Sequence, residues 1–318
     1  MKAVFVAVVA ALCVAGDALA DETPAKRKSL KVLMIGNSFT ASVLKETPSL
    51  AKAEGLPLDI TQCGIGGCTF EKHWKNVEKS GDKDFKPYFT QSFWASDPQY
   101  KSPHKANVTD MLSAEKWDVV TIQQASGKSV SYADYQPYAD NLIAKIRELA
   151  PQAEIVIQQT WSYAPYDGRL ANWKMSPKEM TAAVKSAYSE LAKKHGLRMI
   201  PTGDAVQLFR ERLPVDYGKV LTRAELAAIP RPSTVDFHGD VTGSSAWKKG
   251  TKGSQKDWEE VKLRIDSAHL NPRGQYLQAC VWLGFLFKTD PTAFSHRPKD
   301  LSESDAKLMR QCARDALR

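Results

Sequence analysis

The feature that most constrains the fold is a series of short apolar runs that alternate with helical patterns. Each run is apolar through its length, as are strands that a parallel sheet buries on both faces. Alternation of such strands with helices indicates an α/β domain, a three-layer sandwich with helices on both faces of a five-stranded parallel sheet. The predicted strands are Lys31–Ile35, Leu58–Gln62, Asp118–Gln123, Glu154–Gln159 and Leu197–Pro201.

Five segments show helical spacing of apolar residues. In the longest, Met180 and Leu191 share one face, and Gly196 follows its end, as expected for a helix C-terminus. The predicted helices are Val43–Glu54, Tyr135–Ala150, Pro177–His195, Tyr276–Phe287 and Ser302–Leu317. Two long polar regions, about 72–114 and 205–262, interrupt the pattern as insertions. We find no linker or repeat, so residues 21–318 form a single expected domain.

The N-terminal residues 1–20 differ from the rest. A basic start at Lys2 precedes an apolar run over Ala3–Gly16, and the small-residue pattern Ala18-Leu19-Ala20 follows. This order is typical of a cleaved secretory signal peptide. The apolar run is shorter than the roughly 20 residues of a membrane-spanning helix. We therefore expect a secreted or periplasmic protein without stable membrane insertion.

The charge and the histidines of the chain narrow the range of expected partners and cofactors. The formal net charge is +8, but the basic residues are scattered, and their densest stretch, Trp247–Trp258, reads as a solvated surface loop. We expect no nucleic-acid partner, while an acidic polysaccharide stays open. The six histidines are dispersed, so neither a metal nor another cofactor is expected. The sequence does not indicate an oligomeric state.

Four cysteines remain after the signal peptide, and an exported location permits disulfides. Four cysteines allow three pairings. We favour Cys280 with Cys312, both on predicted helices. Cys63 and Cys68 are close enough in sequence to staple their own loop.

The first predicted strand runs directly into Gly36-Asn37-Ser38, with a helical pattern behind it. One interpretation is a turn with a helix cap. The other is a nucleophilic serine, because sites in open parallel sheets gather at the carboxyl ends of strands. A serine hydroxyl needs an adjacent general base to become a good nucleophile. The choice therefore depends on the rest of the chain.

A carboxylate and an imidazole lie three residues apart in "DSAHLNPRGQYL", ahead of a helix that Pro272 starts. On a loop, Asp266 and His269 can point to one side. Asp266 can then hold the tautomer of His269 whose other nitrogen faces Ser38. Taken singly, Asp266 would be a helix cap and His269 a packed surface residue. Together they complete a predicted Ser-His-Asp triad.

Two further segments carry hydrogen-bond donors just after predicted strands. "CGIGGCTF" contains three glycines, whose N–H groups can approach a substrate oxygen. "VVTIQQASG" ends the third strand with two glutamines, whose side-chain amides could donate as well. Gly64 and Gly66 compete for the backbone role. The expected oxyanion-hole residues are Ser38, Gly67, Gln123 and Gln124.

Aromatic residues cluster in "TWSYAPYDGRLANW" after the fourth strand. Trp161 and Tyr163 could stack on a sugar ring, although aromatic side chains also fill cores. His73 could line the same pocket, the alternative being an exposed histidine on a helix. These three residues are the candidates for substrate binding.

These blocks together carry a resemblance. "GNSFT" resembles the Gly-Asp-Ser block of the SGNH/GDSL hydrolase superfamily, with Asn37 in place of Asp. "GIGGCT" is similar to its glycine block, where Gly67 matches the oxyanion glycine, and "DSAHLNPRGQYL" to its Asp-x-x-His block. The details look most like a branch of secreted bacterial SGNH proteins. The resemblance implies an SGNH-hydrolase/flavodoxin-like fold and an acyl transfer in which Ser38 attacks, His269 moves the proton and Asp266 orients His269.

One block departs from the superfamily. Its third block carries Gly-x-Asn, whose Asn donates to the oxyanion, whereas this chain has "QQAS". Gln123 or Gln124 is the expected replacement.

Three hypotheses for the function follow from these residues. The first is a secreted serine esterase acting on small acyl esters, such as O-acetyl groups on carbohydrate. The second is a carbohydrate-binding protein on the same fold that has lost activity. The third is a lipase or phospholipase, ranked below because the insertions are polar.

Overall fold

The computed structural model describes residues 29–213, 222, 224–225, 228–230, 239–248 and 262–318. The expected signal peptide lies outside the described residues, as do most of the 205–262 insertion and most of the basic stretch from Trp247 to Trp258.

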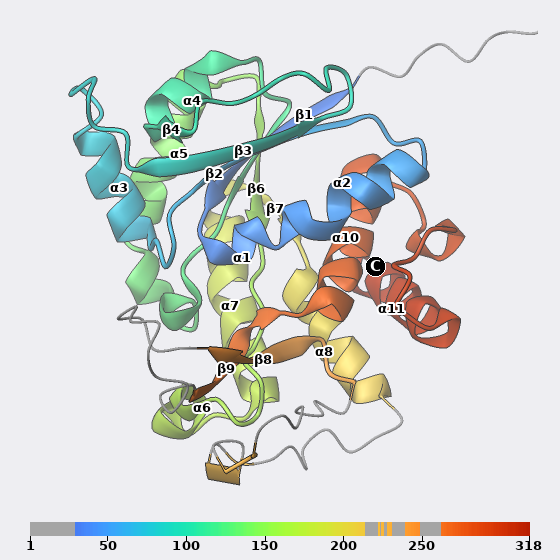
Figure 1. The fold of residues 1–318 in the computed structure, drawn as a ribbon. Coiled ribbons are helices and arrows are strands. Elements are labelled where there is room, and N and C mark those ends of the chain that lie inside the picture. The colour runs from blue at the N-terminus through green and yellow to red at the C-terminus, as the bar shows by residue number, and fades with distance from the viewer. Residues whose placement is uncertain (1–28, 214–221, 223, 226–227, 231–238, 249–261) are drawn as a thin grey trace, which may run out of the picture.

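The core is a seven-stranded sheet in the order β4-β3-β2-β1-β5-β6-β7 (Figure 1). All five predicted strands are present and parallel. Gly36 pairs with Gly64, so the first two strands end side by side. The α/β prediction is therefore confirmed. The parallel strands are β1 (Leu30–Gly36), β2 (Leu58–Gly64), β5 (Val119–Ile122), β6 (Glu154–Gln158) and β7 (Arg198–Ile200).

Two strands that the sequence did not predict extend one edge of this sheet. They are β3 (Tyr88–Trp94) and β4 (Lys105–Ala106), both from the region expected to be an insertion. Strand β3 runs antiparallel to β2 and places Phe89 opposite Gly64. Exposed residues alternate with less exposed ones along β3, as expected for an antiparallel strand with one covered face.

Helices cover both faces of the sheet. The first crossover, α2, leads from β1 to β2, whereas α5 and α7 lead from β5 to β6 and from β6 to β7, in the opposite direction across the sheet. Because parallel crossovers are right-handed, α2 lies on one face and α5 and α7 on the other. On the first face α2 packs against α10, and on the second α5 packs against α3 and α4 (Figure 1). These and the remaining helices are α1 (Ser38–Ala41), α2 (Val43–Ala53), α3 (Phe70–Glu78), α4 (Val108–Ala114), α5 (Tyr138–Leu149), α6 (Gly168–Trp173), α7 (Pro177–His195), α8 (Thr202–Arg212), α10 (Pro272–Phe287) and α11 (Glu303–Ala316).

A second, two-stranded antiparallel sheet stands apart from the main one (Figure 1). It consists of β8 (Thr242–Lys248) and β9 (Lys262–Leu270), with a register shift between Thr242 and Ser244. Asp266 and His269, expected on a loop, lie near the end of β9. Asn271 then caps α10 by accepting from the Gly274 N–H at 3.1 Å.

The cysteine prediction is wrong for this structure. Cys63, Cys68, Cys280 and Cys312 are all buried and free. Burial in apolar surroundings raises the pKa of the Cys280 thiol to about 12, so this group is held as a neutral thiol. Among the described helices, none has the length and apolar content needed to cross a bilayer.

Candidate active site

Ser38 is the first residue of α1, immediately beyond the carboxyl end of β1. The turn between them is tight, because a side chain at Gly36 would collide with Thr40. Asn37 is the N-cap of α1, and its Oδ1 accepts from the Phe39 N–H at 3.0 Å. The serine is therefore fixed at the tip of a buried strand and remains partly exposed.

The three predicted triad residues meet in hydrogen-bonding order. The Ser38 Oγ lies 2.8 Å from His269 Nε2, and His269 Nδ1 lies 2.7 Å from Asp266 Oδ2. A proton on Nδ1 that is donated to the carboxylate leaves Nε2 free to accept from the serine hydroxyl. Ser38 is separated from Asp266 and His269 by at least 228 positions in the chain. Only the fold brings the three side chains together.

Asp266 is held as a carboxylate. Its partial burial opposes ionisation, but hydrogen bonds outweigh this effect and hold the pKa of the carboxyl well below its usual range. The donors are the His269 ring, the His269 N–H at 3.0 Å and the Ala268 N–H at 2.9 Å. A permanently ionised Asp266 stabilises the imidazolium that forms when His269 takes a proton.

The predicted oxyanion loop is a tight turn beside Ser38. The Cys68 N–H donates to Ile65 O at 3.1 Å, and Gly67 has a φ of 63°, a conformation that favours glycine. The Ile65 N–H donates to Gly36 O at 3.1 Å, which ties the turn to the end of β1. Among the described residues, no acceptor pairs with the N–H of Ser38 or of Gly67. Both remain free to bind an oxyanion.

The structure corrects the expectation for the two glutamines. The Gln123 Nε2 donates to Asn37 Oδ1 at 2.6 Å, and the Gln124 Nε2 donates to Asp134 O at 3.0 Å. Gln124 Oε1 accepts from the Phe70 N–H at 3.0 Å. Both side chains are buried, so they support the site from behind instead of facing a substrate. The sequence places them at the strand end but does not show which way their amides turn.

Asn37 connects these supports. Its Oδ1 accepts from Gln123 and from the Phe39 N–H, and its Nδ2 donates to Cys68 O at 3.1 Å. One buried amide thus holds the nucleophile turn and the oxyanion turn in a fixed relation. The "GNS" motif points to this residue, whereas its partners could be found only in three dimensions.

The three candidates for substrate contact are also corrected, because Trp161, Tyr163 and His73 are fully buried. Tyr163 OH lies 2.9 Å from Ser126 Oγ, and His73 Nδ1 lies 2.9 Å from Tyr88 OH. Burial, with a smaller contribution from nearby Lys72, lowers the pKa of His73 to about 3. His73 is therefore a neutral core residue, neither a pocket wall nor an exposed helix position.

Trp161 instead joins the two halves of the triad. Its ring stacks on Phe39, next to the nucleophile, with centroids 4.2 Å apart. Its Nε1 donates to Ala268 O at 2.8 Å, next to His269. Phe39 in turn packs edge-on against the His269 ring at 5.2 Å. The aromatic cluster noted in the sequence is thus a positioning element.

A buried ion pair that the sequence did not reveal holds the β8–β9 hairpin. Arg210 on α8 pairs with Asp240, its Nε lying 3.1 Å from Oδ1 and its Nη2 3.2 Å from Oδ2. Arg210 also donates to Thr242 Oγ1 and to Ser162 Oγ, each at 2.6 Å. Asp240 O accepts from Asn271 Nδ2 at 2.8 Å. The start of β8 and the residue after β9 are thereby fixed to α8.

The described ranges contain no group of three His, Cys, Asp or Glu side chains that could hold a metal ion.

A parallel sheet with helices on both faces, a serine at the end of its first strand and an Asp-x-x-His pair late in the chain define an SGNH/GDSL-type α/β fold. The chain belongs to the DUF4886 family, described as a domain of unknown function, whose profile matches residues 31–220. No curated protein matches the chain.

Solved structures similar to this chain include a DUF4886 family protein from Bacteroides uniformis, with a TM-score of 0.70 and 23% identity over 91% of this chain and 95% of that chain. An acetylxylan esterase from Geobacillus stearothermophilus matches with a TM-score of 0.43 and 15% identity over 81% and 95%. A family 3 carbohydrate esterase from Clostridium thermocellum matches with a TM-score of 0.40 and 12% identity over 82% and 96%. The first of these shows the same fold.

Proposed function

We propose that this protein is an exported serine esterase that hydrolyses small acyl esters through an acyl-enzyme. The observation that carries the proposal is the unbroken hydrogen-bond chain from the Ser38 hydroxyl through His269 to Asp266. In an enzyme of this kind, Ser38 Oγ attacks the ester carbonyl while His269 Nε2 takes its proton. His269 then protonates the leaving alcohol, and water hydrolyses the acyl-enzyme by the reverse path.

The free N–H groups of Ser38 and Gly67 would stabilise the oxyanion in both steps. Because neither glutamine amide faces the site, the proposal relies on two backbone donors. The side chains of His269 and Asp266 are 41% and 38% exposed, so the site is open. An open site suits a small acyl group on a larger alcohol, and O-acetyl groups on carbohydrate are the proposed substrate. Localisation outside the cytoplasm rests on the N-terminal sequence alone.

The test is hydrolysis of p-nitrophenyl acetate by the mature protein beside its Ser38→Ala variant. Loss of a triad nucleophile should lower kcat by about 10⁴- to 10⁶-fold. Ser186→Ala, an exposed serine on α7, serves as the matched control and should retain full activity. Equal rates for the wild type and Ser38→Ala would refute the esterase proposal.

A second candidate, an inactive carbohydrate-binding protein, is favoured by one observation, namely that the third oxyanion donor is not supplied by Gln123 or Gln124. A fluorophosphonate probe separates the two. In an active site, Ser38 Oγ bonds to phosphorus, fluoride leaves and His269 accepts the proton. Mass-spectrometric detection of the adduct on Ser38 excludes an inactive carbohydrate-binding protein, whereas an unmodified Ser38 supports this second candidate.

A further inference from the structure

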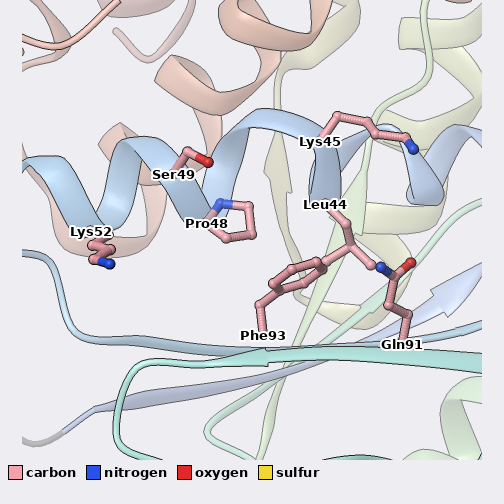
Figure 2. A pocket seen from close by; sticks show the side chains of 7 residues that line it. All are labelled: Leu44, Lys45, Pro48, Ser49, Lys52, Gln91 and Phe93. Atoms are coloured by element: carbon pink, nitrogen blue, oxygen red, sulfur yellow. The ribbon is translucent and has the colours of Figure 1, made fainter. Parts of the chain in front are cut away.

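A groove runs between helix α2 and strand β3, the second strand from one edge of the main sheet. Figure 2 shows its middle part, where Phe93 and Gln91 rise from β3 toward Leu44, and Pro48 and Lys52 follow along α2. This part is a hollow of about 360 Å³. A second hollow of about 610 Å³ shares Pro48, Lys52 and Phe93 with the first and continues the groove to Tyr100 and Lys101. We refer to both hollows together as the α2–β3 groove.

Both walls of the groove begin beside the candidate active site. Helix α2 starts at Val43, directly after the short helix that begins with Ser38. Strand β3 places Phe89 opposite Gly64, the last residue of β2 and the entry to the oxyanion turn. The walls then run away from the site toward the C-terminal end of α2. A long ligand in the groove would therefore extend from Ser38 along β3.

Phe93 lines both hollows, and Phe89 lies beyond them on β3, toward the candidate active site. Phe89 and Phe93 are the exposed large apolar side chains of the described residues, with exposed fractions of 52% and 40%. They lie four residues apart on one face of β3, which spaces them by roughly 14 Å. Ligand sites combine such apolar surfaces with a few polar groups, and exposed aromatic rings offer flat faces for sugar rings. Two rings at this spacing suit an extended chain of sugars.

The polar groups of the groove are cationic. Lys45, Lys52 and Lys101 line the two hollows, and no Asp or Glu lines either one. Among the described residues, none of these lysines has a carboxylate partner. At the end near the site, Lys105 Nζ lies over the Phe89 ring at 3.5 Å. Unpaired positive charge beside aromatic rings is complementary to a ligand that carries carboxylates.

We propose that the α2–β3 groove binds an acidic polysaccharide chain. The sugars stack on Phe89 and Phe93, while their carboxylates pair with Lys45, Lys52 and Lys101. The claim that such a chain presents its acyl ester to Ser38 rests on the proposed function. Binding itself does not rest on it, so the experiment uses the Ser38→Ala protein.

Affinity electrophoresis tests the proposal with two polymers that share one backbone, carboxymethyl cellulose and hydroxyethyl cellulose. The anionic polymer should retard the Ser38→Ala protein, and the neutral polymer should retard it far less. Adding Lys45→Gln and Lys52→Gln should weaken the retardation by several-fold to about tenfold, as expected for two exposed ion pairs. Phe93→Ala should also weaken it. All three side chains are exposed enough for the fold to tolerate these changes.

The matched control is Lys193→Gln with Lys194→Gln, an equal loss of charge at the end of α7 on the opposite face of the sheet. This control should bind as tightly as the parent protein. Equal weakening by both double variants would overturn the proposal, because binding would then depend on the net charge of the protein and not on the groove. Equal retardation by both polymers, or by neither, would overturn it as well. If the anionic polymer binds in the groove but the wild-type protein hydrolyses no ester, the groove proposal stands and only the proposed function is refuted.

Discussion

The two halves of the triad stand on different kinds of structure. Ser38 follows β1, the middle strand of the main sheet, whose residues 32–36 are all buried. Asp266 and His269 stand on a two-stranded hairpin outside that sheet, with side chains more than one-third exposed. We call β1, α1 and the Ile65–Cys68 turn the nucleophile side, and the β8–β9 hairpin the base side.

The difference is in what holds each side. The nucleophile side is fixed by parallel strand pairing and by the apolar core beneath it. A two-stranded hairpin alone is marginally stable, so the base side depends on its attachments. Two of these are the Arg210–Asp240 ion pair and the Trp161 hydrogen bond to Ala268. Precise triad geometry can thus rest on few polar contacts when one partner is rigid.

The largest expected effect tests the base side directly. Asp266→Asn keeps the shape of the side chain but removes the charge and disfavours the His269 tautomer that the triad needs. We expect kcat for p-nitrophenyl acetate to fall on the order of 10⁴-fold with a small change in KM. Asp300→Asn, an exposed aspartate near the start of α11, should leave kcat unchanged. A loss below tenfold in Asp266→Asn would show that the base side is not organised by this carboxylate.

The next prediction breaks the attachment of the base side. Arg210→Met leaves Asp240 buried without its main cationic partner, which should lower the free energy of unfolding by about 3–5 kcal/mol in urea titrations. Esterase kcat should fall as well, because the hairpin carries His269. Replacing both partners, with Arg210→Met and Asp240→Leu, should restore part of the stability.

Arg198→Met provides the matched control for this prediction, since the Arg198–Glu154 pair is exposed. It should cost about 1 kcal/mol or less. If Arg210→Met costs no more than Arg198→Met, the buried pair does not hold the hairpin.

The smallest expected effect is a change of folding stability with pH. It distinguishes His73, near the nucleophile side, from Asp266 on the base side. Burial lowers the pKa of His73, which follows the oxyanion turn on α3, to about 3 in the folded protein, against about 6.5 in an unfolded chain. The unfolded state therefore binds a proton that the folded state rejects, and stability falls as pH drops below 6.5. Between pH 6.5 and pH 5 the expected loss is up to about 2 kcal/mol.

Asp266 behaves differently in this range. Its folded pKa lies below its unfolded value of about 3.9, so its contribution is complete above pH 4 and is lost only in stronger acid. Urea unfolding at pH 7 and pH 5 should therefore show a pH dependence in the wild type that His73→Gln reduces and Asp266→Asn retains. The same pH dependence in the wild type and in His73→Gln would contradict the assignment.

Much of the nucleophile side could be predicted from the sequence, because a buried parallel strand is a continuous apolar run and Ser38 directly follows one. Strand β3 was missed because Tyr88–Trp94 carries paired aromatic residues only at its two ends, around a polar Thr-Gln-Ser centre, and so is neither a continuous apolar run nor an alternating one. The β8–β9 hairpin was missed because the small and polar residues of Thr242–Ala246 and Asp266–His269 form no apolar pattern in the sequence. The amide directions of Gln123 and the stacking of Trp161 depend on partners far away in the chain.

The Asn37–Gln123 pair has a consequence for anyone who redesigns this site. The Gly-Asp-Ser motif that "GNS" resembles has Asp at the place of Asn37, but a carboxylate here would lose the donor to Cys68 O and face that carbonyl with negative charge. The residue cannot be exchanged alone. Converting "GNS" into the common motif would require new hydrogen-bond partners for position 37 at the same time. Residue 37 and the buried residues around it therefore have to be substituted together.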